Sequence, residues 1–479
     1  SKLQFKPGIN REGTNYSNEG GWFNGDKIRF RSGYPESIGG WQRVSNNQFT
    51  GTARKIYDFV TLTSQNLLFI GTEKKTFLEN AGVFSDITPI RSTLSLGSNP
   101  VNTSGGAGSG VVTVTTQTAH GAATGDFVTF ASLTTTDGIT AAQLNIEHEI
   151  TSIPSTTTFT VTTAGSATSG TTAGGGSSGT AAFQIAIGIN TTILGSGWSA
   201  GTWGRFTWGS ASGSLAGSTL RLWAADNFGE DLIFNIADGT IFYWDATNGT
   251  STRAVALTSR TGASDVPVVA RKILVSDVDR HCIAFGTNPI TSSVQDPLLI
   301  RFSSQESTVD WTPTATNTAG DLRLSKGSEI ITAIQTSRQI LVWTDQSLYS
   351  MQFIGAPFTF GVSLIGDNTR IAGPNTAIAV NDIVFWMGQE NFYLYDGRIQ
   401  AIPCTVRDYV FSDMNNQQSF KFHVGSIASQ TEVWWFYCSS GSSEIDRYVV
   451  YNYGQQVWYY GELVRTAWND RASGLRSFP

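Results

Sequence analysis

Side chains that commonly do chemistry are few in this 479-residue chain, and they are widely scattered. The four histidines stand too far apart for the i,i+4 spacing of a helical metal site: His120, His148, His281 and His423. The three cysteines show no CxxC spacing, which argues against a zinc site and a disulfide framework: Cys282, Cys404 and Cys438. The glycine-rich tracts lack the lysine of a phosphate-binding loop. We therefore expect no catalytic residue, no metal and no cofactor, and we expect a protein that is not an enzyme.

One segment resembles a motif of propeller glycosidases. Residues 304–311, SQESTVDW, resemble the sialidase Asp box S-x-D-x-G-x-x-W, but Glu306 replaces its Asp and Thr308 replaces its Gly. Such a box marks a hairpin turn and supplies no catalytic group. Sialidases also need three converging arginines and a tyrosine nucleophile backed by a glutamate, and convergence is not visible in a sequence. A glycan-active propeller, either a sialidase-like hydrolase or a lectin-like receptor binder, is the alternative function.

A stripe of basic residues lies near the N-terminus. Lys27, Arg29 and Arg31 alternate with Ile28 and Phe30, so the three cations share one face of a predicted strand. This face suits DNA phosphates or an acidic partner protein, and the competing interpretation is a solvated edge strand. Because the net charge is −6, we expect no tight duplex binding, and a weakly acidic wall would let DNA pass without sticking.

The elements that must position these residues are short strands joined by turns. An apolar strand, a polar turn with Asp or Gly, and an aromatic-rich return strand recur in three segments, with a related fourth: 340–351, 383–394, 449–460 and 67–78. Trp343 and Trp386 occupy equivalent positions in two copies and are 43 residues apart. A period of about 40–45 residues built from short strands is typical of β-propeller blades.

Composition and spacing favour an all-β propeller of about six blades. Only 14% of the residues are charged, against about 25% in ordinary soluble domains, and 51 residues are glycine. The candidate blades are 51–91, 198–260, 268–325, 329–375, 376–415 and 420–465. Residues 432–438 are apolar after the first, which predicts an inner strand that neighbouring blades cover on both faces. Residues 26–31 are expected to pair with the last blade and so close the ring.

The middle of the chain has a different character. Residues 92–204 contain no Lys or Arg, and alternating segments predict four strands: 111–116, 126–130, 148–153 and 158–162. We expect a small Thr-rich β-domain at 97–185, inserted in a loop and tethered by flexible Gly/Ser linkers. The rest divides into 1–96, an N-terminal arm with the first propeller strands, and 186–479, the remaining blades and a C-terminal tail.

Several strings resemble the tail nozzle, or packaged-DNA stabilisation, proteins of short-tailed bacteriophages. They are Gly8–Glu12, Asn18–Phe23, Asp26–Arg31, Pro35–Trp41, Asp86–Arg91, Leu222–Asp231, Trp343–Asp345, Ile354–Pro357, Phe385–Gly388, Asp408–Phe411 and Arg465–Trp468. The resemblance covers nearly the whole chain outside 97–185.

This resemblance implies a virion structural protein of the tail, made in the host cytoplasm. Subunits of that kind form a homo-oligomeric ring, usually a hexamer, below the portal and the adaptor (head-to-tail connector). The ring continues the channel for double-stranded DNA, retains the packaged genome until ejection and supports tail fibres or a tail needle. A further hypothesis makes the inserted domain the host-contacting element. No apolar run approaches the ~20 residues of a membrane span, and no signal-peptide core is visible at the N-terminus.

Overall fold

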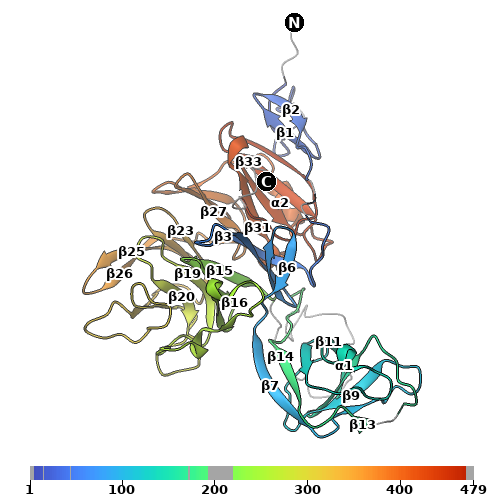
Figure 1. Cartoon of the computed structure of the whole chain (residues 1–479). Helices are drawn as coiled ribbons and strands as arrows, with labels where there is room; N and C mark the ends of the chain where they lie inside the picture. The colour runs from blue at the N-terminus through green and yellow to red at the C-terminus, as the bar shows by residue number, and fades with distance from the viewer. Residues whose placement is uncertain are drawn as a thin grey trace, which may run out of the picture.

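The computed structural model describes residues 5–14, 16–41, 43, 45–170, 173–192 and 220–470. Figure 1 shows a propeller body, a hairpin near the N-terminus and a separate module below the body. Residues 198–219 of the second candidate blade and the predicted tail residues 471–479 lie outside the described residues. The propeller body consists of six four-stranded antiparallel sheets, so the prediction of an all-β propeller with about six blades is confirmed.

The first three blades follow the chain in order. Their strands are β3 (Ala53–Val60), β4 (Asn66–Thr72), β5 (Thr76–Asn80) and β6 (Val83–Asp86); β15 (Trp223–Phe228), β16 (Asp231–Ile236), β17 (Ile241–Trp244) and β18 (Val255–Ala256); and β19 (Ala270–Val275), β20 (Cys282–Thr287), β21 (Leu299–Phe302) and β22 (Gly320–Arg323). Two short 3-10 turns flank β18: η1 (Ala246–Asn248) and η2 (Leu257–Ser259).

The last three blades complete the ring. Their strands are β23 (Ile330–Gln335), β24 (Ile340–Thr344), β25 (Ser347–Gly355) and β26 (Thr359–Asp367); β27 (Ala377–Val380), β28 (Ile383–Met387), β29 (Phe392–Tyr395) and β30 (Ile399–Ala401); and β31 (His423–Ile427), β32 (Glu432–Tyr437), β33 (Arg447–Asn452) and β34 (Val457–Glu462). Between and within these blades lie α2 (Arg407–Asp413), η3 (Asn416–Lys421) and η4 (Ala428–Gln430). Every predicted blade range contains one of the six sheets.

The repeated tryptophans hold neighbouring blades together. Trp343 and Trp386 each occupy the fourth position of a second strand, β24 and β28, and both are fully buried. Their rings meet edge to face with centroids 5.6 Å apart, a favourable aromatic geometry. The two tryptophans that are 43 residues apart therefore mark a repeat and also contact each other between adjacent blades.

The last blade uses the repeated hairpin in a different place. The hairpin at 449–460 joins the third and fourth strands of this blade, β33 and β34, whereas the other three copies join second and third strands. Residues 432–437 form the second strand, an inner strand of the sheet, and β31 lies nearest the axis. The N-terminal arm covers the outer strands of this blade, with Ile9 and Phe30 buried against it, so the outer strands are apolar as well.

The N-terminal strand does not close the ring as predicted. β1 (Ile28–Arg31) pairs with β2 (Tyr34–Ser37) in a hairpin that lies beside β34 at the outer edge of the last blade (Figure 1). A few bonds fasten the arm, including Ile9 N–H to the Trp458 carbonyl at 2.7 Å. The arm thus covers an edge strand that would otherwise be open to another chain.

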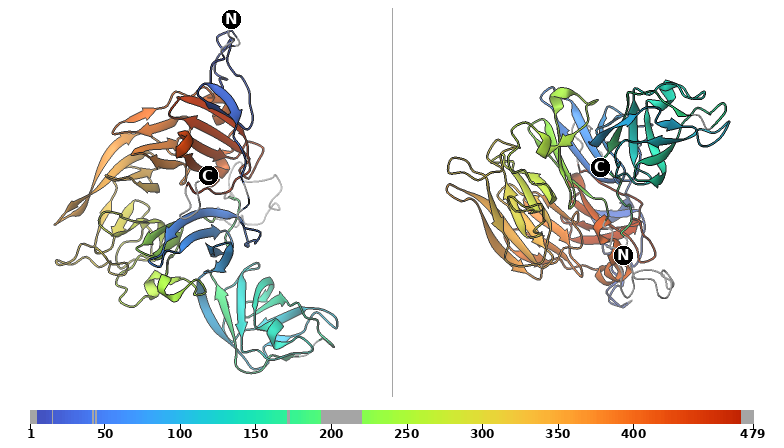
Figure 2. Two further views of the ribbon diagram at one scale, coloured as in Figure 1. Left: turned by 45° about the horizontal axis from the view of Figure 1, so that its top comes forward. Right: turned by 90° about the horizontal axis from the view of Figure 1, so that it is seen from below.

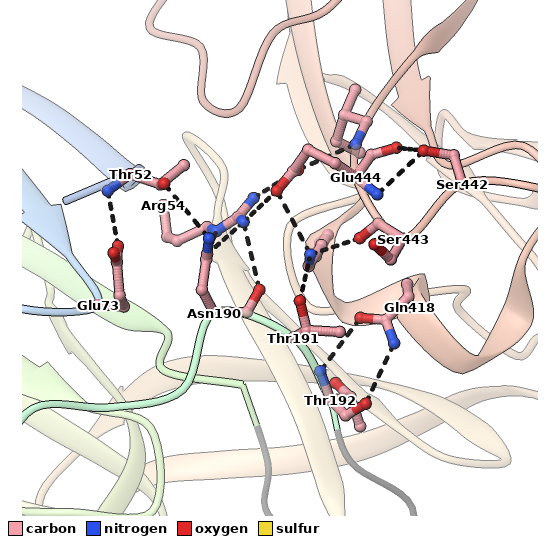
Figure 3. Close-up of polar contacts among 12 residues, drawn as sticks. Thr52, Arg54, Glu73, Asn190, Thr191, Thr192, Gln418, Ser442, Ser443 and Glu444 are labelled. Carbon is pink, nitrogen blue, oxygen red and sulfur yellow. Dashed lines mark hydrogen bonds and ion pairs between the residues drawn. The ribbon is translucent and has the colours of Figure 1, made fainter. Parts of the chain in front are cut away.

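Ring closure instead uses a polar cluster, which we call the clasp and define as Arg54, Asn190, Gln418, Lys421 and Glu444 (Figure 3). Arg54 on β3 donates to the Glu444 carboxylate in the last blade, with Nη1 to Oε1 at 2.8 Å, and to the Asn190 side chain. Lys421 lies 3.4 Å from the same carboxylate. The side chains of Arg54 and Lys421 are only 1% exposed. The clasp therefore joins the first blade, the last blade and the chain that leaves the inserted domain.

An aromatic wedge completes the closure. Trp468 stacks on Trp434 at 6.2 Å and meets Trp41 edge to face at 6.3 Å. The wedge needs a glycine beneath it, because a Cβ on Gly425 would lie 2.2 Å from the Trp468 ring. Beyond the wedge, Asn469 donates to Asp58 on β3 at 2.8 Å. The C-terminal segment thereby links the last blade to the first.

The inserted module is an eight-stranded sheet in the order β13-β8-β9-β12-β11-β10-β14-β7. Its elements are β7 (Ile90–Gly97), β8 (Val101–Asn102), β9 (Val111–Thr115), β10 (Phe127–Ala131), α1 (Ala141–Leu144), β11 (Glu147–Ser155), β12 (Thr158–Thr162), β13 (Ala173–Gly174) and β14 (Gly179–Gln184). The four predicted segments correspond to β9, β10, β11 and β12. The strands run from residue 90 to 184, against the expected domain at 97–185.

The expected flexible linkers are structured. β7 and β14 pair with each other and form the stalk of the module (Figures 1 and 2). The two Gly/Ser-rich tracts, residues 97–108 and 165–179, also bond to one another where they are described. The Gly108 N–H donates to the Ala167 carbonyl at 2.8 Å. A Cβ on Gly170 would lie 2.4 Å from the Gly106 Cα, so this glycine permits a close backbone approach.

Replacing Arg54 with alanine should weaken ring closure. The change leaves Asn190 without its partner and Glu444 with only Lys421. Because the Glu444 side chain is 34% exposed, the cost should be below the about 3–5 kcal/mol that is typical of a fully buried pair. We expect the midpoint of urea unfolding to fall clearly. Arg323→Ala is the matched control, because Arg323 pairs with Asp296 on the surface and should leave the midpoint unchanged. Equal midpoints for Arg54→Ala and wild type would show that the clasp does not stabilise the ring.

Candidate functional site

The strongest candidate site is a cavity of about 460 Å³ on the axis of the propeller. The first strands of consecutive blades lie side by side around this axis, and β3, β15, β19 and β23 all contribute lining residues. The volume falls within the range of about 300–1,000 Å³ that is usual for small-molecule pockets. We call this cavity the axial channel.

A repeated tetrapeptide places the two lysines of the channel. β3 begins Ala-Arg-Lys-Ile at residue 53, and β19 begins with the same four residues at 270. Because strand side chains alternate, Arg and Lys point in opposite directions in both copies. Arg54 enters the clasp, and Arg271 pairs with Glu329 and Asp238 at 2.8 and 2.6 Å. Lys55 and Lys272 line the channel.

The two lysines have little local compensation for their charge. Lys272 donates to the Thr332 hydroxyl at 3.0 Å, and burial together with the charge of Lys55 lowers the pKa of Lys272 to about 7. Burial also lowers the pKa of Lys55, although Asp226 and Asp470 oppose this shift. About half of Lys272 is therefore neutral at physiological pH.

Beside the lysines lies a tyrosine–aspartate pair. Tyr57 donates to Asp226 at 2.9 Å, and the other carboxylate oxygen of Asp226 accepts the Val275 N–H at 2.8 Å. Burial raises the pKa of both groups, so Tyr57 stays a phenol and the Asp226 carboxylate is a weaker acid than usual. The channel thus combines amine, phenol and carboxyl groups with an apolar wall that includes Leu222 and Ile331.

Sequence patterns alone did not single out this channel. The available signal was the Ala-Arg-Lys-Ile repeat, which puts two charges inside strands that are otherwise largely apolar. Its meaning depends on β3 and β19 both being innermost strands. That arrangement becomes visible only when the blades are in place.

The predicted basic strand face is divided in the structure. Arg29 turns toward the propeller and contacts the buried Glu432 carboxylate, with Nε to Oε1 at 3.1 Å. Glu432 also accepts bonds from the Trp434 indole and the Tyr459 hydroxyl. Lys27 precedes the strand and pairs with Asp26 at 3.3 Å, and Arg31 is exposed. The three cations do not form one free stripe, because Arg29 anchors the arm; DNA or partner contact by Lys27 and Arg31 stays a prediction.

The histidines and two of the cysteines are buried, and Cys404 is half-buried. His423 stacks on Phe436 at 4.8 Å, and His281 bonds to the Thr318 hydroxyl at 2.9 Å. Burial lowers the pKa of both to about 4. His120 and His148 lie in the inserted module, far from these two in the chain, and all four are buried. Burial raises the pKa of all three cysteine thiols. Within the described ranges, no group of three or more His, Cys, Asp or Glu could hold a metal ion.

The Asp-box-like segment forms the connection between β21 and β22. Its Trp311 is buried and donates to the Thr308 carbonyl at 2.9 Å, and Ser304 N–H bonds to the Asp310 carbonyl. Glu306 is exposed and lies 3.1 Å from Arg280. The segment packs as a turn, away from the residues that line the axial channel.

The sequence matches no family model and no curated protein. Among solved structures, it is similar to Kluyvelomyces marxianus Hsv2, with 8% identity over 49% of this chain and a TM-score of 0.28. It is also similar to the phage phi92 endosialidase, with 10% identity over 93% and a TM-score of 0.23. A third is Porphyromonas gingivalis PorZ, a component of a type-IX secretion system, with 9% identity over 59% and a TM-score of 0.27. The matches span 59%, 62% and 50% of those chains, respectively.

Removing the Arg29 side chain should loosen the N-terminal arm. Arg29→Ala leaves the buried Glu432 without its cation, which typically costs about 3–5 kcal/mol. We expect faster cleavage before residue 50 in limited proteolysis and a lower unfolding midpoint. Lys27→Ala and Arg31→Ala are matched controls beside the same strand and should behave like wild type. If Arg31→Ala were as damaging as Arg29→Ala, the ion pair would not be the anchor.

Lys272 should make stability depend on pH above neutrality. Its folded pKa of about 7 lies below the ordinary lysine value of 10.5, so between these values the unfolded chain binds more protons and stability rises with pH. Lys272→Met should therefore be more stable than wild type below pH 7, and its advantage should shrink as pH approaches 10.5. Urea unfolding of both proteins across pH 6–10 checks this, and a constant difference would show that Lys272 titrates normally.

Proposed function

We propose that the protein is a structural subunit of a phage virion tail, a nozzle protein that forms a ring below the adaptor. The proposal rests on the positions in the fold of the segments that resemble tail nozzle proteins. Gly8–Glu12 contacts the segment that starts α2: Asp408 N–H donates to Glu12 at 2.7 Å. Trp41 meets Trp468 from another string. Resembling segments from both ends of the chain therefore contact one another on the last blade. This supports an architecture shared with the tail nozzle proteins.

In this proposal DNA passes between subunits and not through one propeller. The axial channel has room for a small molecule, about 460 Å³. A DNA duplex has grooves about 12 and 6 Å wide and is far larger than this space. A conduit for the packaged genome therefore requires several copies around a common lumen.

Projections on the propeller are suited to contacts in an assembly. The hairpin β25–β26 extends from the body (Figure 1), and near its turn Phe353, Ile354 and Phe358 are 43%, 56% and 72% exposed. Contiguous exposed apolar side chains commonly mark interaction surfaces. The inserted module and the N-terminal hairpin extend in other directions (Figure 2). A subunit that contacts neighbours, adaptor and fibre needs several such surfaces, and the module is also our candidate for host contact.

The glycan-active alternative retains one favourable observation, the Tyr57–Asp226 pair in the channel. A sialidase also needs three arginines on the substrate carboxylate. Among the described residues that line the channel, Arg271 is the one arginine, and Glu329 and Asp238 already pair with it. Turnover of a fluorogenic sialoside by the purified protein would nevertheless decide for this alternative.

The nozzle proposal predicts ring assembly that depends on the β25–β26 hairpin. Purified protein mixed with its adaptor should give rings of about six subunits by electron microscopy and native mass measurement. Phe358→Asp should abolish rings while the protein stays folded, because it puts a charge into an apolar contact. Val83→Asp, on a strand of the first blade and 59% exposed, is the control and should assemble normally. A wild-type chain that stays monomeric and docks on no adaptor ring contradicts the proposal.

A further inference from the structure

We propose that the axial channel is a binding site for a small organic anion, a carboxylate or a phosphate monoester, held between the ammonium groups of Lys55 and Lys272. The inference goes beyond the nozzle role and does not rest on it. It starts from two cationic side chains that line the same cavity.

Within the part of the chain that the structure describes, neither lysine has a carboxylate within ion-pair distance. Lys272 has the Thr332 hydroxyl as its hydrogen-bond acceptor, and Lys55 has neither a hydrogen bond nor an ion pair among the described residues. The two charges are near enough for Lys55 to lower the pKa of Lys272. An anion between them would relieve both their burial and their mutual repulsion.

The acidic groups of the channel are largely occupied. Arg271 pairs with both Asp238 and Glu329. Asp226 accepts the Tyr57 hydroxyl and the Val275 N–H.

The two remaining acids are also accounted for. Asp277 is exposed at the rim of the lining, and its charge acts mainly on Asp226 and Tyr57, whose pKa values it helps to raise. Asp470 acts on Lys55 from outside the lining and accepts bonds from Ser426 and Trp468. The centre of the channel therefore holds two ammonium groups and a single carboxyl, Asp226, whose acidity burial weakens.

Size and lining define the ligand class. A cavity of about 460 Å³ is larger than a bare inorganic ion requires. Leu222, Trp223, Ile331 and Ala333 supply an apolar wall, while Thr332 and Tyr57 supply hydroxyl groups. An anionic head with a compact, partly apolar body matches these surroundings.

Binding is tested on the isolated chain with inorganic phosphate and benzoate as probes, at constant ionic strength set with chloride. We expect saturable binding of one probe per chain, measured by calorimetry. Lys55→Met and Lys272→Met should each weaken binding at least tenfold, and Lys326→Met, which changes an exposed lysine, should not. Tighter phosphate binding assigns a phosphate monoester, and tighter benzoate binding assigns a carboxylate.

A second measurement on the wild type avoids dependence on the variants. In protein with ¹³C-labelled lysine, the NMR titration midpoint of Lys272 should rise when the tighter probe is added, because an anion favours the charged amine. The proposal is overturned if neither probe binds saturably, if binding survives both Lys→Met changes, or if the midpoint does not move. Ring assembly is measured separately, so failure here leaves the nozzle proposal standing.

Discussion

One half-buried carboxylate, at the junction of the first and last blades, holds the ring closed. Each blade of a propeller buries its faces against its neighbours, but the first and last blades come from opposite ends of this chain, and no strand is shared between them. Glu444 resolves this by accepting Arg54 from the first blade while Lys421 of the last blade lies beside it. Burial is the largest influence on Glu444 and alone would raise its pKa, but the hydrogen bonds from Arg54 and the Ile445 N–H and the charges of Arg54 and Lys421 together lower the pKa to about 2. The carboxylate is therefore charged throughout the neutral range, and the axial channel exists because this junction keeps β3 in the ring.

Sequence periodicity predicted most of the propeller because its signals are local. A strand that is buried between blades is apolar, and a turn contains Gly or Asp. Both patterns can be recognised in a stretch of about ten residues of sequence. The failures share another cause: a pattern reports that a residue is buried but not what covers it. Tyr459 lies in a predicted hairpin strand, yet Phe30 from the N-terminal arm packs on it. Arg29 alternated like a surface cation, yet its carboxylate partner lies 403 residues away.

The channel shows the same limit for function. The Ala-Arg-Lys-Ile repeat is plain in the sequence, but its two charges serve opposite purposes in each copy. The arginines bind adjoining blades, where an ion pair satisfies them. The lysines face the axis, where neither has a carboxylate within ion-pair distance among the described residues. Two charged groups without an ion-pair partner in the described part of the chain, Lys55 and Lys272, thus lie at the propeller axis. The candidate site is therefore at the axis and not at the histidines.

The inserted module differs from the axial channel, because most of its acidic side chains pair with basic side chains near the junction with the propeller. Residues 92–204 have four acids and no bases. Glu147 pairs with Lys75 and Arg253 at the propeller junction, and Glu149 and Asp126 lie 3.5 Å from Lys74 and Arg91.

The fourth acid, Asp137, is used within the module, where it accepts bonds from the Thr103 hydroxyl and the Gly170 N–H. With all four acids engaged, the outer strands present mainly hydroxyls such as Thr151 and Thr160, which bond each other. Recognition by this surface must rest on shape and neutral hydrogen bonds, so salt should affect it little, whereas its attachment to the propeller is electrostatic.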